Sequence, residues 1–220
     1  MADNYLEKKM EELRSGRLGQ SNPAARSVGG RRSGVLQVAF PPRRVLVAGG
    51  CNGVGAAIAR SYLKTGCKVA VFDNDRETGD ILAQKEGIRF YHIDLADAEA
   101  VENGFTNLLS AWRDIDIIIN ASLRSPVKSL ADLWCAHRTK YPIPTEYGGR
   151  MIILSSDRQI INSSEIINSS MDTLSKFGIS VNGITVNSMT AETEKTVTRL
   201  CLFLSLPGNQ LLDRLQIPVG

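Results

Sequence analysis

The feature that most constrains the fold of this chain is a short apolar run that ends in a cluster of glycines. Residues 45–48 are Val-Leu-Val-Ala, and glycines follow at positions 49, 50, 53 and 55. A continuous apolar run of this length is typical of a strand buried on both faces of a parallel sheet. Glycine permits a sharp turn and lets backbone amides approach a ligand closely. The pattern therefore predicts a strand, a glycine turn and a helix over residues 53–63.

A second apolar run and an acidic residue complete this unit. Residues 68–72 predict the next strand, and Asp73 follows at its carboxyl end. The amino end of the preceding helix carries unpaired amides and the positive end of the helix dipole, which favour a phosphate. A carboxylate after the second strand can accept both ribose hydroxyls of an adenosine and would repel a 2′-phosphate. The order predicts a dinucleotide site that favours NAD over NADP, although a glycine turn that binds nothing remains the simpler alternative.

Composition limits the classes of partner. The chain has 220 residues with 43% hydrophobic content, which suits one sizeable domain. Its net charge of +3 is modest, so charge alone does not favour a nucleic-acid or membrane partner. No apolar run reaches membrane-spanning length and the first residues lack the apolar core of a signal peptide, so we expect a cytoplasmic protein.

The cysteines and histidines do not predict a metal site. The four cysteines are scattered, which matches neither a disulfide framework nor metal-ligand spacing and is typical of reduced thiols. His92 and His137 have no cysteine or carboxylate at ligand spacing. We expect both histidines to be structural.

The chain divides by composition into two parts. Residues 1–40 predict a short charged helix over residues 5–14 followed by a basic arm rich in Gly, Ser and Arg, and residues 41–220 predict the dinucleotide-binding domain. No aromatic residues are interleaved with the arginines of the arm, as stacking on nucleic acid would require. An arm that packs on the domain or on a neighbouring subunit is therefore favoured over a nucleic-acid contact.

From residue 45 onward, apolar runs alternate with amphipathic segments. This alternation predicts an α/β fold of the Rossmann type, a doubly wound parallel sheet in three α/β/α layers. Expected strands span 45–48, 68–72, 88–93, 115–119, 150–154, 179–186 and 215–219. Helices are expected over 53–63, 76–86, 129–137 and 191–204, around Val101, Phe105, Leu108 and Trp112, and around Ile167, Met171 and Leu174.

Four motifs along these elements resemble those of one known family. Residues 48–55 are similar to a Thr-Gly-x-x-x-Gly-x-Gly loop, with Ala48 in place of the Thr, and residues 177–184 match a Gly-Ile-x-Val-Asn strand. Asp94-Leu95 is similar to an acidic pair beside the adenine ring, and residues 120–122 are similar to an Asn-Asn-Ala-Gly element. In these motifs the chain resembles the short-chain dehydrogenases/reductases from about Val45 to Gly220.

The resemblance implies a cofactor site, an activity and an assembly. It implies NAD-dependent oxidation or reduction of a carbonyl or alcohol, and a homo-oligomer. Asn187-Ser188 replaces the Pro-Gly of the family on the nicotinamide side. The residues implied at the cofactor are Gly49, Asn52, Gly53, Val54, Gly55, Asp73, Asp94, Leu95, Asn120 and Ala121.

The catalytic residues of the family are only partly present. Ser155 or Ser156 fits the serine that polarises the substrate carbonyl, but no Tyr occurs after Tyr147, so the Tyr-x-x-x-Lys pair is missing. In the family the Lys lowers the pKa of the Tyr toward neutrality, because a phenol with a pKa near 10 is a poor acid at neutral pH. Counting forward from Ser156 places the missing Tyr near Asn168 or Ser169.

Substitutes for the pair are weak. Tyr141 lies in a Pro-containing stretch that could form a lid, Tyr147 suits a turn, and Lys176 suits a solvated helix end. Tyr5 and Lys9 have the right spacing but lie in the charged N-terminal helix. Two functions therefore stay open. One is an oxidoreductase with a degenerate active site acting on a small-molecule substrate, and the other is a non-catalytic dinucleotide-binding or scaffold protein.

Overall fold

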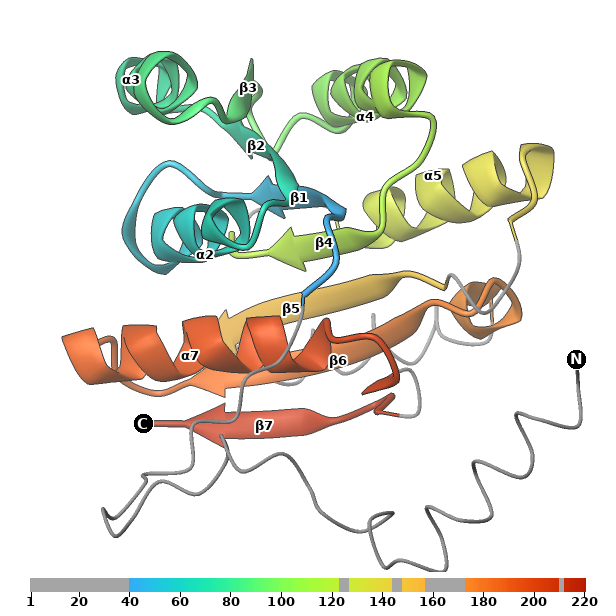
Figure 1. Ribbon diagram of the computed structural model, residues 1–220. Helices are drawn as coiled ribbons and strands as arrows, with labels where there is room; N and C mark the ends of the chain where they lie inside the picture. The colour runs from blue at the N-terminus through green and yellow to red at the C-terminus, as the bar shows by residue number, and fades with distance from the viewer. Residues whose placement is uncertain (1–39, 123–126, 144–147, 157–172, 210–211) are drawn as a thin grey trace, which may run out of the picture. The chain divides into compact units, whose positions relative to one another are not determined.

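The computed structural model describes residues 40–122, 127–143, 148–156, 173–209 and 212–220 (Figure 1). Residues 39–220 form one compact unit. The expected N-terminal helix, the basic arm and the Tyr5–Lys9 spacing lie outside the described residues. So do Tyr147 and the segment with Ile167, Asn168, Ser169 and Met171.

Seven parallel strands form one sheet in the order β3-β2-β1-β4-β5-β6-β7 (Figure 1). The chain starts near the centre at β1, builds outward to β3, and then returns to β4 on the other side of β1. The carboxyl ends of β1 and β4 therefore form the topological switch point, where doubly wound sheets bind ligands. The doubly wound α/β fold expected from the sequence is confirmed. The strands are β1 (Arg44–Ala48), β2 (Lys68–Asp73), β3 (Arg89–His92), β4 (Ile117–Asn120), β5 (Arg150–Ser156), β6 (Ser180–Val186) and β7 (Gln216–Val219).

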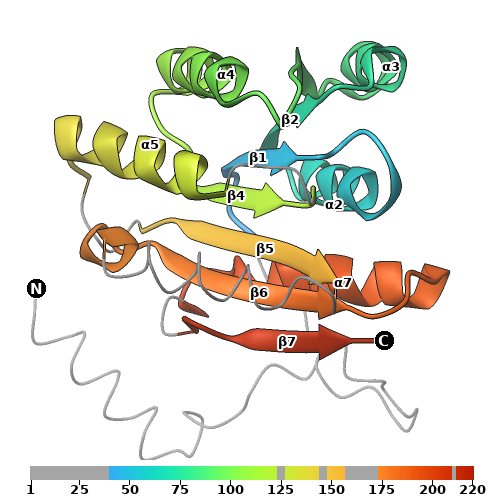
Figure 2. The ribbon, with the colours of Figure 1, turned by 180° about the vertical axis from the view of Figure 1, so that it is seen from behind.

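Helices cover both faces of the sheet (Figure 2). On one face α2, α3 and α7 pack against the side chains of Val45, Val47 and their neighbours. On the opposite face α4 and α5 pack against Leu46, Phe72 and their neighbours. The helices are α2 (Gly53–Lys64), α3 (Arg76–Glu86), α4 (Ala98–Trp112), α5 (Val127–Lys140) and α7 (Ala191–Leu204). No helix among the described residues is long and apolar enough to cross a membrane.

Short polar residues begin the helices, as N-cap chemistry requires. The side chains of Asp75, Asp97 and Thr190 accept hydrogen bonds from the first-turn amides of α3, α4 and α7. Helix α3 ends at Gly87, whose φ of 73° is in the left-handed region that favours glycine at a helix end. Local sequence thus fixes where these three helices start.

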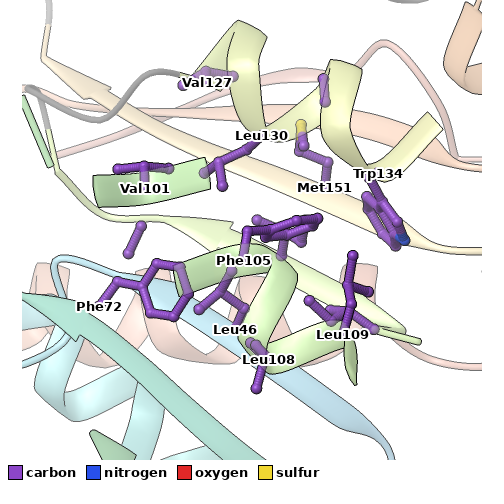
Figure 3. Packing of buried hydrophobic residues seen from close by; sticks show 14 of the residues in the cluster. Leu46, Phe72, Val101, Phe105, Leu108, Leu109, Val127, Leu130, Trp134 and Met151 are labelled. Atoms are coloured by element: carbon purple, nitrogen blue, oxygen red, sulfur yellow. The ribbon is translucent and has the colours of Figure 1, made fainter. Parts of the chain in front are cut away.

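The core above β1 and β4 is built from α4 and α5 (Figure 3). Val101, Phe105 and Leu108 are fully buried, so the expected apolar face of α4 is confirmed. Helix α5 is longer than the expected segment 129–137 and continues to Lys140. The reason is Arg138, which is buried one turn after Trp134 instead of lying in solvent. A charged residue near a helix end does not predict that burial.

Candidate dinucleotide site

The glycine loop between β1 and α2 makes two contacts that only glycine allows. A Cβ on Gly55 would lie 1.9 Å from the carbonyl oxygen of Gly49, so the helix starts in direct contact with the turn. Gly49 has a φ of 81°, and a Cβ there would lie 2.8 Å from the Cβ of Ser122. The loop therefore depends on Gly49 and Gly55 for its shape.

The amino end of α2 has no side-chain cap. Asn52 is the N-cap residue, yet its side chain makes no cap hydrogen bond. Its amide Nδ2 donates instead to Oδ2 of Asp75 at 2.8 Å. Gly53 has a φ of 52°, and a Cβ there would meet nothing within 4 Å. Gly53 in the first turn thus borders open space, which suits an anion at a helix amino end.

Asp73 joins the glycine loop to the carboxyl end of β2. Its Oδ2 accepts the N–H of Cys51 at 2.9 Å, and its Oδ1 accepts the N–H of Asp75 at 3.1 Å. An ionised carboxylate has about four acceptor positions. Two positions on this half-buried side chain therefore remain for hydroxyl donors, so the residue can hold the loop and a ribose at once.

Asp75 is a second carboxylate at this edge, and sequence reasoning missed it. The Thr78 N–H and the Asn52 amide lower the pKa of Asp75, which stays negative beside Asp73. Burial and these two carboxylates raise the pKa of the Cys51 thiol to about 12, so that thiol is protonated at neutral pH. The spacing Asp75-x-x-Thr78 at a helix start was the signal that could have identified Asp75.

The remaining cofactor candidates lie at the carboxyl ends of β3 and β4. Asp94 is exposed after β3, and Leu95 packs into the core beside it. Asn120 ends β4 and is 4% exposed. Its Oδ1 has no hydrogen-bond partner among the described residues. A buried acceptor without a partner costs about 1–3 kcal/mol, so a ligand donor at Asn120 would be favourable. Ala121 follows, and its N–H donates to the carbonyl of Ala48 at 2.9 Å.

The two candidate serines at the end of β5 have different surroundings. Ser155 is buried, and its Oγ lies 3.3 Å from Oγ1 of Thr185 on β6. Ser156 follows at the carboxyl end of the strand and is half-buried. Because side chains alternate across a strand, the two hydroxyls face opposite sides of the sheet. Ser156 is the one that solvent and a small molecule can reach.

Other polar candidates lie away from this edge. Tyr141 follows the end of α5 and lines a recess of about 1000 Å³ with Arg44, which begins β1. That recess is at the amino ends of the strands, so the expectation of a Tyr141 lid over the site is wrong. The ring of His137 contacts the carbonyl of Arg113 at 2.7 Å, and that of His92 contacts the carbonyl of Asn74 at 3.2 Å. No metal-ligand group occurs among the described residues, and all four cysteines are free thiols.

The carboxyl edge is the better candidate site, although the recess of about 1000 Å³ beside Tyr141 lies at the other edge. The fold brings Gly49, Gly53, Asp73 and Asn120 to that edge from three adjacent strands. Two independent features, an uncapped helix and an unpartnered buried acceptor, point to a ligand there. The described residues of this edge therefore fit the phosphates and the ribose of a dinucleotide.

Part of this chain is similar in sequence to known proteins. Residues 43–134 match the family model described as short chain dehydrogenase. The chain is 32% identical over 93 residues to "Short-chain dehydrogenase reductase 5" of Arabidopsis thaliana, which covers 40% of this chain and 36% of that protein. It is 36% identical over 78 residues to "Serine 3-dehydrogenase" of Agrobacterium fabrum, covering 34% of this chain and 31% of that protein. The chain thus matches about a third of the length of these relatives.

Solved structures share the fold over a longer range. A citronellol catabolism dehydrogenase of Pseudomonas aeruginosa PAO1 superposes with a TM-score of 0.64 at 16% identity, covering 82% of this chain and 96% of that one. An apo SCOR enzyme from Clostridium thermocellum gives a TM-score of 0.65 at 18% identity, covering 80% and 90%. At such identities the likeness concerns the fold alone. Over residues 43–134 the chain is thus similar in sequence to short-chain dehydrogenases, and over most of its length it shares their fold.

Proposed function

We propose that this chain binds NAD(H) at the carboxyl edge of β1, β2 and β4 and acts as an oxidoreductase on a carbonyl or alcohol substrate. The observation that carries the proposal is the glycine loop held by Asp73, with the uncapped start of α2 beside it. The bound nicotinamide would supply the hydride chemistry. The protein would supply binding, orientation and the polar groups around the substrate.

Each part of the edge has a role in this proposal. The amides of Gly53, Val54 and Gly55 bind the phosphates, and Asp73 accepts the ribose hydroxyls. Asp75 adds a second negative charge where a 2′-phosphate would lie, so two carboxylates support the preference for NAD over NADP. The residues proposed beside the adenine and the rest of the cofactor are Gly49, Asn52, Asp94, Leu95, Asn120 and Ala121.

Ser156 is the proposed polar group at the substrate. Its half-buried hydroxyl at the end of β5 can donate a hydrogen bond to a carbonyl oxygen. Ser155 is proposed to be structural, because its hydroxyl is buried against Thr185.

A non-catalytic function is the second candidate, and one observation favours it. The sequence has no Tyr after Tyr147, so no Tyr-x-x-x-Lys pair follows Ser156. A general acid typically contributes about 10²–10⁴-fold to the rate, so turnover without the pair would be slow. Purified protein with NADH and a panel of ketones and aldehydes separates the candidates. NADH consumption above background supports the oxidoreductase, and saturable NADH binding with no consumption supports a binding or scaffold protein.

Replacing Asp73 with asparagine is expected to weaken NADH binding by roughly tenfold or more, since a hydrogen bond to a charged group contributes about 1.5–3 kcal/mol. The preference for NADH over NADPH should narrow, because the variant removes one of the two carboxylates proposed to repel the 2′-phosphate of NADPH. Titration of both cofactors measures the ratio. Asp80→Asn is the control, because it removes an exposed charge from α3 without touching the loop. An unchanged ratio in Asp73→Asn would refute the role of this carboxylate.

The two serines make a matched pair of variants. Where turnover is found, Ser156→Ala should lower kcat by about a hundredfold, the effect of removing one donor to a developing oxyanion. Ser155→Ala should leave kcat close to that of the wild type, because its hydroxyl contacts only Thr185 among the described residues. Steady-state kinetics on both variants checks the assignment. A larger loss in Ser155→Ala than in Ser156→Ala would reverse it.

We also propose a homo-oligomer, as the family resemblance implies. Light scattering on the eluted peak of a size-exclusion column would give its mass, and a monomer at all concentrations would exclude the assembly.

A further inference from the structure

The opposite edge of the sheet carries a recess that the dinucleotide site does not use. It has a volume of about 720 Å³ and lies at the amino ends of β1, β2 and β5. Among the described residues that line it, four carry basic side chains and one carries a carboxylate. These are Arg43, Arg44, Lys68, Arg150 and Asp116.

Backbone hydrogen bonds place these charges next to one another. The N–H of Lys68 donates to the carbonyl of Arg43 at 2.8 Å, and the N–H of Asp116 donates to the carbonyl of Arg44 at 2.9 Å. The N–H of Arg150 then donates to the carbonyl of Asp116 at 3.0 Å. The parallel register of four strands therefore holds the charged residues in one row along the edge.

The single carboxylate is already used by one of the cations. Arg44 binds Asp116 through two side-chain hydrogen bonds, Nε to Oδ2 at 2.9 Å and Nη2 to Oδ1 at 2.7 Å. Among the described residues, neither Arg43 nor Lys68 forms an ion pair. Among the described residues that line the recess, Arg43 and Lys68 are therefore two cations outside its internal pair.

Arg150 is a buried cation in this recess, with 2% of its surface exposed. Its guanidinium Nη1 donates to the carbonyl of Gly149 at 2.8 Å. Burial, and next the charge of Arg43, lower the pKa of Arg150 to about 10, while Asp213 opposes the shift. Arg43, which is half-buried, therefore adds positive charge next to this buried guanidinium.

We infer that this recess is a second binding site, distinct from the dinucleotide site, for a multivalent oxyanion carried by a phosphorylated or polycarboxylate small molecule. Arg43 and Lys68 are its accessible cations. Arginine and lysine bind such groups through charge-assisted hydrogen bonds. The basic row lies at the opposite ends of the strands from the glycine loop, so the two sites can be filled independently.

Inorganic pyrophosphate is a suitable probe, with citrate as the carboxylate arm. At constant ionic strength held with KCl, the melting temperature of the whole chain should rise saturably with pyrophosphate. The variant Arg43→Gln/Lys68→Gln should weaken that affinity by at least about tenfold, the equivalent of 1.4 kcal/mol. Lys85→Gln/Arg89→Gln removes two exposed cations that do not line the recess, and should bind pyrophosphate as the wild type does. A larger rise in melting temperature with pyrophosphate assigns the ligand to phosphorylated molecules, and a larger rise with citrate assigns it to polycarboxylates.

Pyrophosphate could also bind at the amino end of α2, so NADH is titrated into the same variants. The inference requires Arg43→Gln/Lys68→Gln to lose pyrophosphate affinity while any NADH affinity stays that of the wild type. It is overturned if the wild type shows no saturable response to either anion, or if the double variant responds like the wild type. A wild type that binds pyrophosphate at this recess but no NADH would support the inference and refute the proposed cofactor function.

Discussion

Replacing Gly55 with alanine is expected to weaken NADH binding at least about tenfold and to destabilise the fold. Helix propensity alone predicts the opposite sign for stability, because alanine is favoured over glycine in a helix by about 1 kcal/mol. The added Cβ, however, would lie 1.9 Å from the carbonyl oxygen of Gly49. A backbone oxygen cannot rotate away as a side chain can, so the loop and α2 must separate. Overpacking of this kind typically costs about 1–3 kcal/mol.

Gly183→Ala is the matched control for Gly55→Ala. The three nearest atoms to a Cβ on Gly183 all belong to the end of the flexible Gln216 side chain, which can move aside. NADH titration and thermal unfolding of both variants give the comparison. Gly183→Ala should bind NADH as the wild type does. Wild-type NADH affinity in Gly55→Ala would contradict the role given to the glycine loop.

Replacing Arg138 with methionine is expected to lower the free energy of unfolding by about 3–5 kcal/mol, the cost of leaving one member of a buried ion pair alone. Arg138 is 1% exposed, and its Nη2 lies 3.1 Å from Oδ2 of Asp114. Its guanidinium also lies 4.9 Å from the ring centre of Trp134. The other cation near Asp114 is Arg44, at 3.8 Å. The methionine variant would therefore bury a carboxylate with little compensation.

The double variant Asp114→Asn/Arg138→Met should recover much of that loss, because it removes the uncompensated charge. The exposed pair Lys128–Asp132 on the same helix is the control. Lys128→Met should change the free energy of unfolding by no more than about 1 kcal/mol. Urea unfolding of the three variants measures these differences. Equal losses of unfolding free energy in Arg138→Met and Lys128→Met would contradict the larger contribution assigned to the buried pair.

The parts of the fold that follow from local pattern could be predicted from sequence. The apolar strand before the glycines, the position of Asp73 at the end of β2, and the buried face of α4 all depend on periodicity and spacing within one segment. The candidate dinucleotide site could be located for the same reason, because one βαβ unit supplies its loop and its carboxylate.

Features that depend on contacts between distant segments could not be predicted. Arg138 and Asp114 are far apart along the chain, and a basic residue near the end of α5 resembles a solvated one until the helix is packed. Asn52 donates to Asp75 instead of capping α2, and this hydrogen bond depends on how the loop lies against the start of α3. The basic row of Arg43, Lys68 and Arg150 forms only when four neighbouring strands align in register.

The central claim is that the edge built from the glycine loop, Asp73 and Asn120 binds NAD(H). Titration of the purified chain with NADH and, in parallel, NADPH, followed by cofactor fluorescence, tests it most directly. We predict saturable binding of NADH at one site per chain, with weaker binding of NADPH. The absence of saturable NADH binding by the folded chain, or tighter binding of NADPH, would contradict the account.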